Sequence, residues 1–442
     1  MTLLSVVSDN PRDLQILVNQ AVQYSITHRY KLQPQKSVVI EINKKGRNQQ
    51  DKNLPRKINQ DDMPTVEKSA HLGILRSKSN QKTENSQIEQ NITKARRTAY
   101  SLLSTGFYGK NGLDPITSIS LYKTYVQPVL MYGLEIVQPK QTNLKKLEVF
   151  QKNILKQILS LPTNAPDPAI YIISGLLPIE AILDIKYMTL FNNICRQHDD
   201  AIEKQLMTRQ LNIKTNESKS WFTILKKTLI KYDFSNINEL VAKPPKKSIW
   251  KSLIMKAVER YWAKKIREIA TWYPSLERLN SEIYKPKLYH PILDISRDLN
   301  PSKAAMTVGI KIRLVTGTYF LQEVRAKYTC VSPLCELCDE DVENLDHFLL
   351  KCKVLHAPRL QHLSKINDIL EDHIDTSFDS LDSVTKIQMI IDCTKFRNSR
   401  FELNDIAEQQ MEQNSRIMCY ALHCIRSRSI TCHRRKSDKR VI

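Results

Sequence analysis

Eighteen residues, CELCDEDVENLDHFLLKC from Cys335 to Cys352, constrain the fold of this chain more than any other stretch. They hold three cysteines and one histidine in a C-x2-C-x8-H-x4-C pattern. The C-x2-C pair forms a tight turn that directs two sulfurs at one point, and the H-x4-C pair presents two ligands from the ends of a short helix. Three thiolates and one neutral imidazole suit tetrahedral Zn2+ with no open position. The pattern predicts a structural zinc site made of Cys335, Cys338, His347 and Cys352.

The ligand set has two rivals and the site has one competing interpretation. Cys330 and His356 lie close enough in the sequence to replace one of the four ligands. The cysteines could also be buried or free thiols of a reduced protein, since cysteine packs as a small apolar residue. The surrounding sequence favours the metal, because Asn344 or Asp346 can cap a short helix that begins near the histidine.

Composition indicates a mainly helical, basic protein. The chain has 442 residues, of which 41% are hydrophobic and only 9 are glycine, so sizeable cores form without many tight hairpins. Lys and Arg outnumber Asp and Glu by 67 to 46, a net charge of +21. Such an excess predicts a polyanionic partner, RNA or DNA, bound with weak sequence selectivity. A basic but merely solvated surface is the alternative.

Cysteine usage and hydropathy bear on the compartment. The 9 cysteines are an odd number, and no charged and apolar leader opens the chain. We expect a reducing environment, nuclear or cytoplasmic, and no secretion. The most apolar run, from Ala169 to Leu177, is too short to span a bilayer, so no membrane is expected.

The first part of the chain mixes strand and helix signals. Residues 1–9 are typical of a short strand, and a helix is expected from Pro11 onwards. Residues 37–42 are β-branched, residues 44–62 are polar and loop-like, and residues 71–75 form a second short strand or hairpin arm. Together they predict a small αβ piece.

The remainder is expected to be helical. Helices are predicted after Asp114, over 144–158, over 179–195 and across 366–425, from apolar residues at intervals of three and four. All four tryptophans fall within 221–272, where they are expected to be core residues.

Several stretches, taken in order, resemble the C-terminal half of reverse transcriptases from non-LTR (LINE-type) retrotransposons. MTLLS and PRDLQILVNQAVQYS resemble the strand and helix after the catalytic turn, LQPQKSVVI resembles motif D, and HLGIL resembles the primer grip. ARRTAYSLLSTGF with LYKTYVQPVLMYGLEI resembles the start of the thumb, and KIRLVTGTY followed by the Cys/His pattern resembles the terminal zinc region.

The resemblance implies a mainly α fold with a small αβ remnant of a reverse-transcriptase palm, a helical thumb and connection, and a C-terminal zinc knuckle. Five segments follow from it: a partial palm over 1–90, a thumb-like region over 91–205, a connection over 206–310, a zinc-binding region over 311–360, and a helical segment with a basic tail over 361–442.

The resemblance also implies that polymerase chemistry is missing. The family holds two Mg2+ ions, about 4 Å apart, on carboxylates that include a Tyr-x-Asp-Asp turn. This chain begins just after the place of that turn, so Mg2+ matters only if the missing part is supplied. Asp61 and Asp62 lie in a polar stretch without flanking apolar strands and are not expected to bind metal. Lys36 matches the motif D lysine, which is idle without the carboxylates.

Nucleic-acid contacts are expected from the primer-grip residues and from rows of cations. Glycine at the grip would let a strand approach the backbone closely. Solvated helix faces, an ordinary hairpin turn and a disordered tail are the alternatives. The expected contacts are Leu72, Gly73, Lys94, Arg96, Arg97, Lys145, Lys146, Lys152, Lys156, Lys351, Lys353, Arg359, Arg434 and Arg435.

The favoured function is that of a truncated retrotransposon product that binds nucleic acid and zinc without polymerising. One alternative is the C-terminal portion of an intact RNA-directed DNA polymerase whose catalytic part is encoded upstream. Another is a recruited helical scaffold protein. A nuclease is disfavoured, because no acidic run with a lysine follows Cys352 on a strand.

Overall fold

The computed structural model describes residues 5–42, 56–104, 112–296, 298 and 301–438, without the side chains of residues 80, 301–302 and 430–438. The described chain is mainly helical, as expected, and its strands form two small two-stranded sheets. It divides into two compact units. One comprises Met1–Ala95 and Val129–Lys145, and the other comprises Arg96–Pro128 and Lys146–Ile442. The five segments expected from the sequence stay a prediction.

In the first unit, helix α1 (Pro11–Thr27) begins as predicted. The Asn10 side chain accepts a hydrogen bond from the Arg12 amide, and Pro11 occupies the first turn, where no amide is needed. Val18 and Val22 pack with Ile58 in a small apolar cluster. This cluster holds the helix against strand β1 (Lys57–Ile58).

The strand predictions for this region are only partly correct. Residues 5–8 form no strand, and of 37–42 only Val39 makes a bridge, to Thr65. Residues 1–4 and 43–55 lie outside the described part of the chain. At the end of the expected polar loop, β1 pairs antiparallel with β2 (Asp61–Asp62). Tertiary contact with α1 makes strands of residues whose own propensity is low.

Residues 71–75, expected to be a second short strand or a hairpin arm, instead contain the turn of a hairpin. Strands β3 (Lys68–His71) and β4 (Ile74–Ser77) pair antiparallel around a two-residue turn in which Leu72 and Gly73 have φ of 52° and 76°. Positive φ at both positions is the geometry that matches the strand twist, and it favours glycine. The hydroxyl of Tyr132 donates to the Leu72 carbonyl at 2.7 Å. The turn is therefore held by a residue far along the chain.

Helix α2 (Asn80–Leu102) follows the hairpin and is joined to it by buried amides. Gln87 accepts from the Leu75 amide at 2.7 Å and donates to Asn91 at 2.9 Å. Asn91 in turn donates to the carbonyls of Leu130 and Tyr132. These bonds connect the hairpin, α2 and the chain before α5 (Leu134–Val137).

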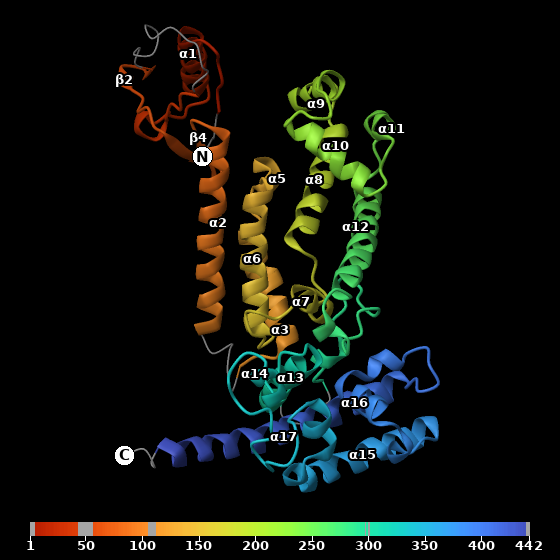
Figure 1. Ribbon diagram of the computed structural model, residues 1–442. Helices are drawn as coiled ribbons and strands as arrows, with labels where there is room; N and C mark the ends of the chain where they lie inside the picture. Colours follow the sequence, from red (N-terminus) through yellow and green to blue (C-terminus); the bar gives the residue numbers. More distant parts are fainter. Residues whose placement is uncertain (1–4, 43–55, 105–111, 297, 299–300, 439–442) are drawn as a thin grey trace. The chain divides into compact units, whose positions relative to one another are not determined.

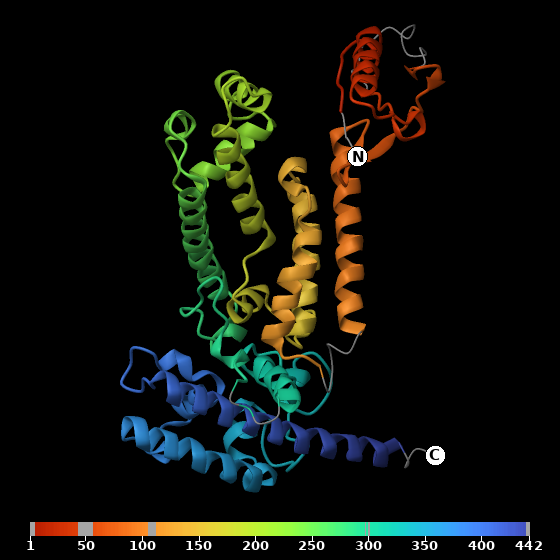
Figure 2. The ribbon, with the colours of Figure 1, turned by 180° about the vertical axis from the view of Figure 1, so that it is seen from behind.

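The second unit contains most of the helices. The first of them are α3 (Pro115–Leu121), α6 (Gln141–Ile158, whose first turn belongs to the other unit), α7 (Asp167–Ser174), α8 (Ile179–Cys195), α9 (Ile202–Ile213), α10 (Trp221–Lys231), α11 (Ile237–Ala242) and α12 (Lys247–Ala270). The predicted helix over 179–195 agrees with α8. Helices α8 and α12 pack along each other, and both views show them side by side (Figures 1 and 2).

Gly175 ends α7 in the left-handed conformation, with φ of 65°. A side chain there would place its Cβ 2.2 Å from the Leu288 carbonyl oxygen. The close approach is used, because the amide of Lys287 donates to the Gly175 carbonyl at 2.7 Å. Glycine is required here both by φ and by space.

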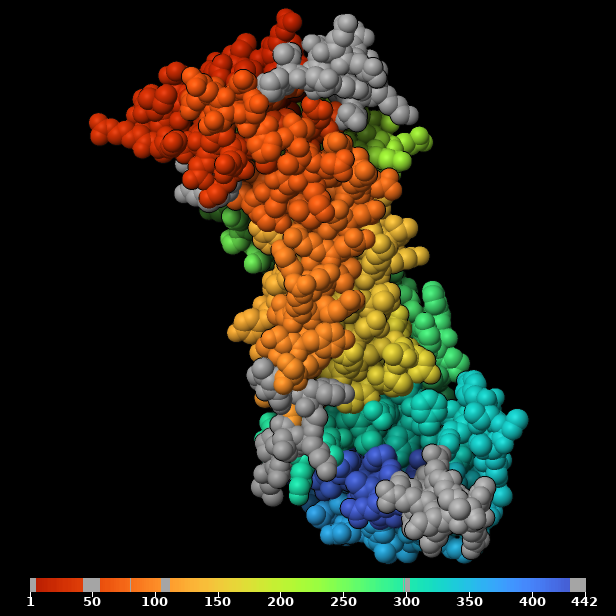
Figure 3. All heavy atoms as spheres, turned by 90° about the vertical axis from the view of Figure 1, so that its left-hand side faces the viewer, coloured from red at the N-terminus to blue at the C-terminus, as the bar shows by residue number. Residues whose placement is uncertain are grey.

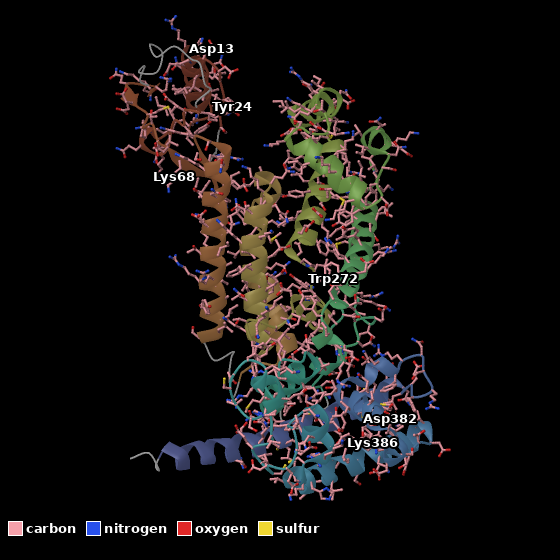
Figure 4. The ribbon with its side chains drawn as sticks, viewed as in Figure 1. Asp13, Tyr24, Lys68, Trp272, Asp382 and Lys386 are labelled. Atoms are coloured by element: carbon pink, nitrogen blue, oxygen red, sulfur yellow. The ribbon has the colours of Figure 1, made fainter. Side chains whose placement is uncertain are left out.

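The tryptophans do not all lie in the core. Trp250 and Trp262 are buried, and Nε1 of Trp250 donates to the Met188 carbonyl at 2.8 Å. Trp272, labelled in Figure 4, follows the end of α12 and is 73% exposed. The expectation that every tryptophan is a core residue is wrong at Trp272, which lies in the turn beyond the last residue of α12.

The C-terminal part of this unit surrounds one long helix. Its elements are α13 (Pro301–Val315), α14 (Gln322–Ala326), η7 (His347–Lys351), η8 (Lys353–Leu355), α15 (His356–Ile374), α16 (Ser383–Asp392) and α17 (Asp405–Asp438). Helix α17 packs on α13, α15 and α16, and the cyan and blue segments form one packed body of atoms (Figure 3). Fully buried Lys311 donates to Glu412 and Ser415 of α17.

Among the described helices, none is by itself long and apolar enough to cross a membrane. Only α7 and α8 meet that criterion together, and they are bent by 61° at their junction.

Candidate metal centre

A short loop, closed by one β-bridge, holds the first two cysteines. Leu334 and Val342 form an antiparallel bridge, and the amide of Cys335 donates to the Asp341 carbonyl at 2.9 Å. Inside this loop the amide of Asp339 donates to the Cys335 carbonyl at 2.8 Å, and Asp339 has φ of 57°. Aspartate tolerates this left-handed conformation better than most residues. The loop thereby directs both sulfurs to one side.

A single turn of helix presents the other two ligands. Oδ1 of Asn344 accepts from the His347 amide at 2.8 Å, so Asn344 and not Asp346 is the cap. The five-residue turn η7 then widens, and the amide of Cys352 donates to the His347 carbonyl at 2.8 Å. The widened turn brings the side chains of His347 and Cys352 together.

The four ligand atoms converge. Every pair among the sulfurs of Cys335, Cys338 and Cys352 and the ring nitrogen of His347 lies within 4.8 Å. Two sulfurs, of Cys335 and Cys352, are 3.9 Å apart, and the Cys338 sulfur is 3.4 Å from Nε2 of His347. Tetrahedral Zn2+ with ordinary bond lengths requires about 3.8 Å between sulfurs and about 3.6 Å between sulfur and nitrogen. The residues fit the ion, and the predicted ligand set is brought together.

The rival ligands are not part of this group. Cys330 and His356 are both exposed, and neither belongs to the cluster of ligand atoms among the described residues. Three of the four cluster residues are buried, which closes the site to water. A closed site with three thiolates and an imidazole suits a structural ion and leaves no position for a substrate.

Burial determines the protonation of the free thiols. It raises the pKa of Cys335 to about 12, although the amides of Leu337 and Cys338 donate to its sulfur and act in the opposite direction. Burial likewise raises the pKa of Cys352 against two backbone amides. N–H groups directed at sulfur stabilise the thiolate once a cation is present. The pocket therefore disfavours bare thiolates and suits thiolates bound to metal.

A carboxylate lies near the histidine, on the side away from the cysteines. Nε2 of His347 faces the cysteines, so Nδ1 points away and is buried. Oδ2 of Asp341 lies 3.7 Å from Nδ1. A carboxylate beside the distal nitrogen of a metal-binding histidine fixes the tautomer and makes the imidazole a better ligand. Asp341 is positioned for this role.

Arg359 supports the centre instead of contacting nucleic acid. Its side chain is buried, and Nη2 donates to the carbonyls of Cys352 at 3.1 Å and Phe348 at 3.4 Å. Burial lowers the pKa of Arg359, and the neighbouring Cys352 acts in the opposite direction. Three thiolates with Zn2+ carry one net negative charge, which this guanidinium offsets. The expectation that Arg359 contacts phosphate is wrong because its side chain is enclosed.

The Cys/His knuckle, residues 333–356, is docked on the rest of the unit. Glu343 is buried, and its Oε2 accepts from the Gln322 amide at 2.8 Å. Both of its oxygens accept from Arg426 of α17. The ring of Phe348 lies 5.5 Å from that of Tyr319. These contacts fix the centre relative to α14 and α17.

Two further cations at the knuckle are already paired. Lys351 forms an ion pair with Asp346, and Lys353 forms one with Glu340. All four side chains are at least partly exposed, so these pairs contribute little to stability and can exchange partners. Contact of Lys351 and Lys353 with phosphate stays a prediction.

The four lysines of α6 that are expected to contact phosphate fall into two groups, one paired with a carboxylate and one exposed. Lys152 and Lys156 bind the two oxygens of Asp167, at 2.7 and 3.1 Å. Lys156 also donates to the Thr163 carbonyl, and its side chain is only 8% exposed. The expectation of phosphate contact is wrong at Lys156, because the amphipathic helix turns this residue inward. Lys145 and Lys146 are exposed.

The other predicted contact residues are on the surface or lie outside the description. Lys36 is exposed in a 3-10 turn, and Leu72 is exposed at the hairpin. Lys94, Arg96 and Arg97 are exposed on α2. Arg434 and Arg435 belong to the last turns of α17, but their side chains are outside those that the structure describes.

The sequence prediction missed the residues around the ligands. Asp341 lies in the acidic run between the two ligand pairs, and a carboxylate at that position is a sequence signal for a residue that lies beside a ligand. Glu343 and Arg426 are 83 residues apart, and no local pattern connects them.

Comparisons of the chain with protein-family models, with curated proteins and with solved structures find no match.

Proposed function

We propose that this chain binds RNA or DNA through the phosphate backbone, that its zinc centre is structural, and that it performs no polymerase chemistry by itself. The observation that carries the proposal is a set of exposed cations, Arg96 and Arg97 on α2 and Lys145 and Lys146 on α6. Among the described residues none of the four has a carboxylate ion-pair partner. With a net charge of +21, such cations suit a polyanion.

The zinc centre supports this proposal as an architectural element. Its ligands leave no open position, so it supplies rigidity to residues 333–356 and no reaction. The resemblance of the chain to the thumb and zinc region of non-LTR reverse transcriptases suggests the same class of partner.

The positions of the candidate carboxylates do not favour catalysis by a pair of metal ions. Two-metal catalysis requires carboxylates held rigidly enough to keep two metal ions about 4 Å apart. Asp61 and Asp62 are both exposed on the two-residue strand β2, and Asp62 lies 3.7 Å from Lys57. Purified protein should extend no primer with Mg2+ or Mn2+. Template-dependent incorporation above that of a mock purification would contradict this part of the proposal.

Binding is tested by the salt dependence of affinity. A fluorescent single-stranded RNA is titrated with the full chain at several salt concentrations. Each phosphate neutralised contributes about 0.7 to the slope of log affinity against log salt. We expect a steep slope that becomes shallower when Arg96, Arg97, Lys145 and Lys146 are replaced by glutamine.

A matched control removes four exposed cations elsewhere in the chain. Arg209, Lys251, Lys256 and Arg260 on α9 and α12 serve this purpose, since all four are exposed. Their replacement by glutamine should change the slope less than replacement of the proposed set. Affinity independent of salt, or equal effects of the two sets, would favour a scaffold without nucleic-acid contact through α2 and α6.

A further inference from the structure

A cavity lies between the end of α6, α13 and the C-terminal half of α17. Its volume is about 390 Å³, and its polar lining comes from Ser160, Arg313, Tyr420, His423, Ser427 and Arg428. Two arginines, an imidazole and hydroxyl groups surround it, and none of its lining residues is acidic. The metal centre does not use this cavity, and no residue expected to contact nucleic acid lines it.

A hydrogen bond to a backbone carbonyl fixes the position of the Arg313 side chain. Its Nε donates to the carbonyl of Ser160 at 2.7 Å. Ser160 has φ of 55°, which turns that carbonyl at the end of α6. Gly309 allows the approach, since a Cβ there would lie 3.0 Å from Cβ of Ser160. With Nε occupied, the two Nη groups of Arg313 are left to donate to an acceptor in the cavity.

Helix α17 supplies several of the residues that line the cavity. Two neighbouring rows of α17 line the cavity: His423 and Ser427 are four residues apart, and Tyr420, Cys424 and Arg428 recur at intervals of four. Arg428 is exposed, and neither it nor Arg313 has a carboxylate ion-pair partner in the described part of the chain. Within the part of the chain that the structure describes, the cavity thus has two guanidinium groups without a counter-charge.

His423 lies in the positive electrostatic potential of nearby arginines. A ring nitrogen of His423 is 2.8 Å from the hydroxyl of Tyr319. Burial lowers the pKa of His423, and Arg426 and Arg313 lower it further. An anion in the cavity would oppose the effect of the arginines.

We propose that this cavity binds the phosphate group of a nucleotide, with Arg313 and Arg428 donating to the phosphate oxygens. Guanidinium groups match phosphate geometry and form short, charge-assisted hydrogen bonds. The hydroxyl group of Ser160 borders the same space, and that of Ser427 lies 3.4 Å from the ring nitrogens of His423. The volume is within the range of small-molecule sites, so it accommodates more than the anion alone, and Tyr420 offers an aromatic surface to the base.

The inference is independent of backbone binding by α2 and α6, since it concerns other residues. Its phosphate could come from a free mononucleotide or from the phosphorylated 5′ end of a strand. Both sources present the same phosphomonoester.

The test uses the full chain loaded with zinc and calorimetric titration at near-neutral pH. Adenosine 5′-monophosphate should bind at least about tenfold more tightly than adenosine or succinate, because charge-assisted hydrogen bonds are lost without the phosphate. A short oligonucleotide with a 5′-phosphate is compared with its 5′-hydroxyl form. Tighter binding of the 5′-phosphate strand than of its 5′-hydroxyl form identifies the strand end as a source, and equal binding of the two strands identifies the free nucleotide, because backbone binding is the same for both strands.

Variants assign the site. Arg428→Gln should weaken binding of the mononucleotide about tenfold, whereas Arg260→Gln, at an exposed arginine of α12, should leave it unchanged. Arg428 is exposed, so its replacement preserves the fold, and circular dichroism verifies this. Arg313→Lys should weaken binding as well, since lysine keeps the charge but cannot hold the Ser160 carbonyl with Nε. Equal binding of adenosine and its monophosphate, tighter binding of succinate, or equal effects of the variants at 428 and 260 would overturn the proposal.

Discussion

Arg426 of α17 and Glu343 of the Cys/His knuckle form a buried two-point ion pair. Nε of Arg426 donates to Oε1 of Glu343 at 2.7 Å, and Nη2 donates to Oε2 at 2.6 Å. The side chains are 8% and 1% exposed. The knuckle is thus attached to the longest described helix by a pair that water does not reach, and it is not an independent appendage.

Breaking this pair should destabilise the protein strongly. In Glu343→Gln, Arg426 stays buried without its counter-charge, and loss of one partner of a buried pair costs about 3–5 kcal/mol. The free energy of unfolding, measured by urea denaturation of the zinc-loaded chain, gives the cost.

The control is a pair of the same charges at the surface. Glu268 lies 3.9 Å from Lys264 on α12, with both side chains exposed. Glu268→Gln should change the free energy of unfolding by less than about 1 kcal/mol. Similar losses for the two variants would show that burial of the Glu343–Arg426 pair has no energetic consequence.

Zinc binding should depend on Cys338 and not on Cys330. The chain as purified should hold one equivalent of zinc, and Cys338→Ser should lose it, because a neutral hydroxyl replaces a thiolate. Cys330 is exposed and outside the ligand cluster, so Cys330→Ser should keep the metal. Metal analysis after gel filtration measures both. Less than half an equivalent in the unmutated chain would mean that the cluster is no zinc site.

Asp341 should tune the affinity of the centre without being a ligand. Asp341→Asn removes the negative charge 3.7 Å from Nδ1 of His347 and should weaken zinc binding roughly 10–100-fold. Asp339→Asn removes the same charge from the same loop while keeping a residue that tolerates φ of 57°. Competition with a chromophoric chelator compares the two. Equal losses would assign the effect to general electrostatics.

Affinity for zinc should fall steeply as the pH is lowered. Burial raises the pKa of Cys335 to about 12 and also raises that of Cys352, so both thiols carry protons at neutral pH. Zinc must displace both protons, and each pH unit downward therefore weakens the apparent affinity about 100-fold from these two groups alone. The same chelator competition between pH 6.5 and 7.5 checks this. A change below tenfold per unit would show that the thiols are ionised before metal binds.

The sequence alone determined the features that are local. The four residues of the candidate metal centre lie within eighteen residues, and their spacing requires only a turn and one turn of helix to bring them together. The starts of α1 and α3 were predictable for the same reason, since Asn10 and Asp114 cap residues two or three positions away.

Only the tertiary structure decided the features that join distant segments. Arg359 and Lys156 have the charge of surface residues, yet packing encloses both. Arg426 meets Glu343, and Arg313 meets Ser160, across 83 and 153 residues. The physical reason is range. Capping and ligand spacing act through a few bonds of chain, whereas the burial of a side chain depends on which helices pack against it, and no short window of residues contains that information.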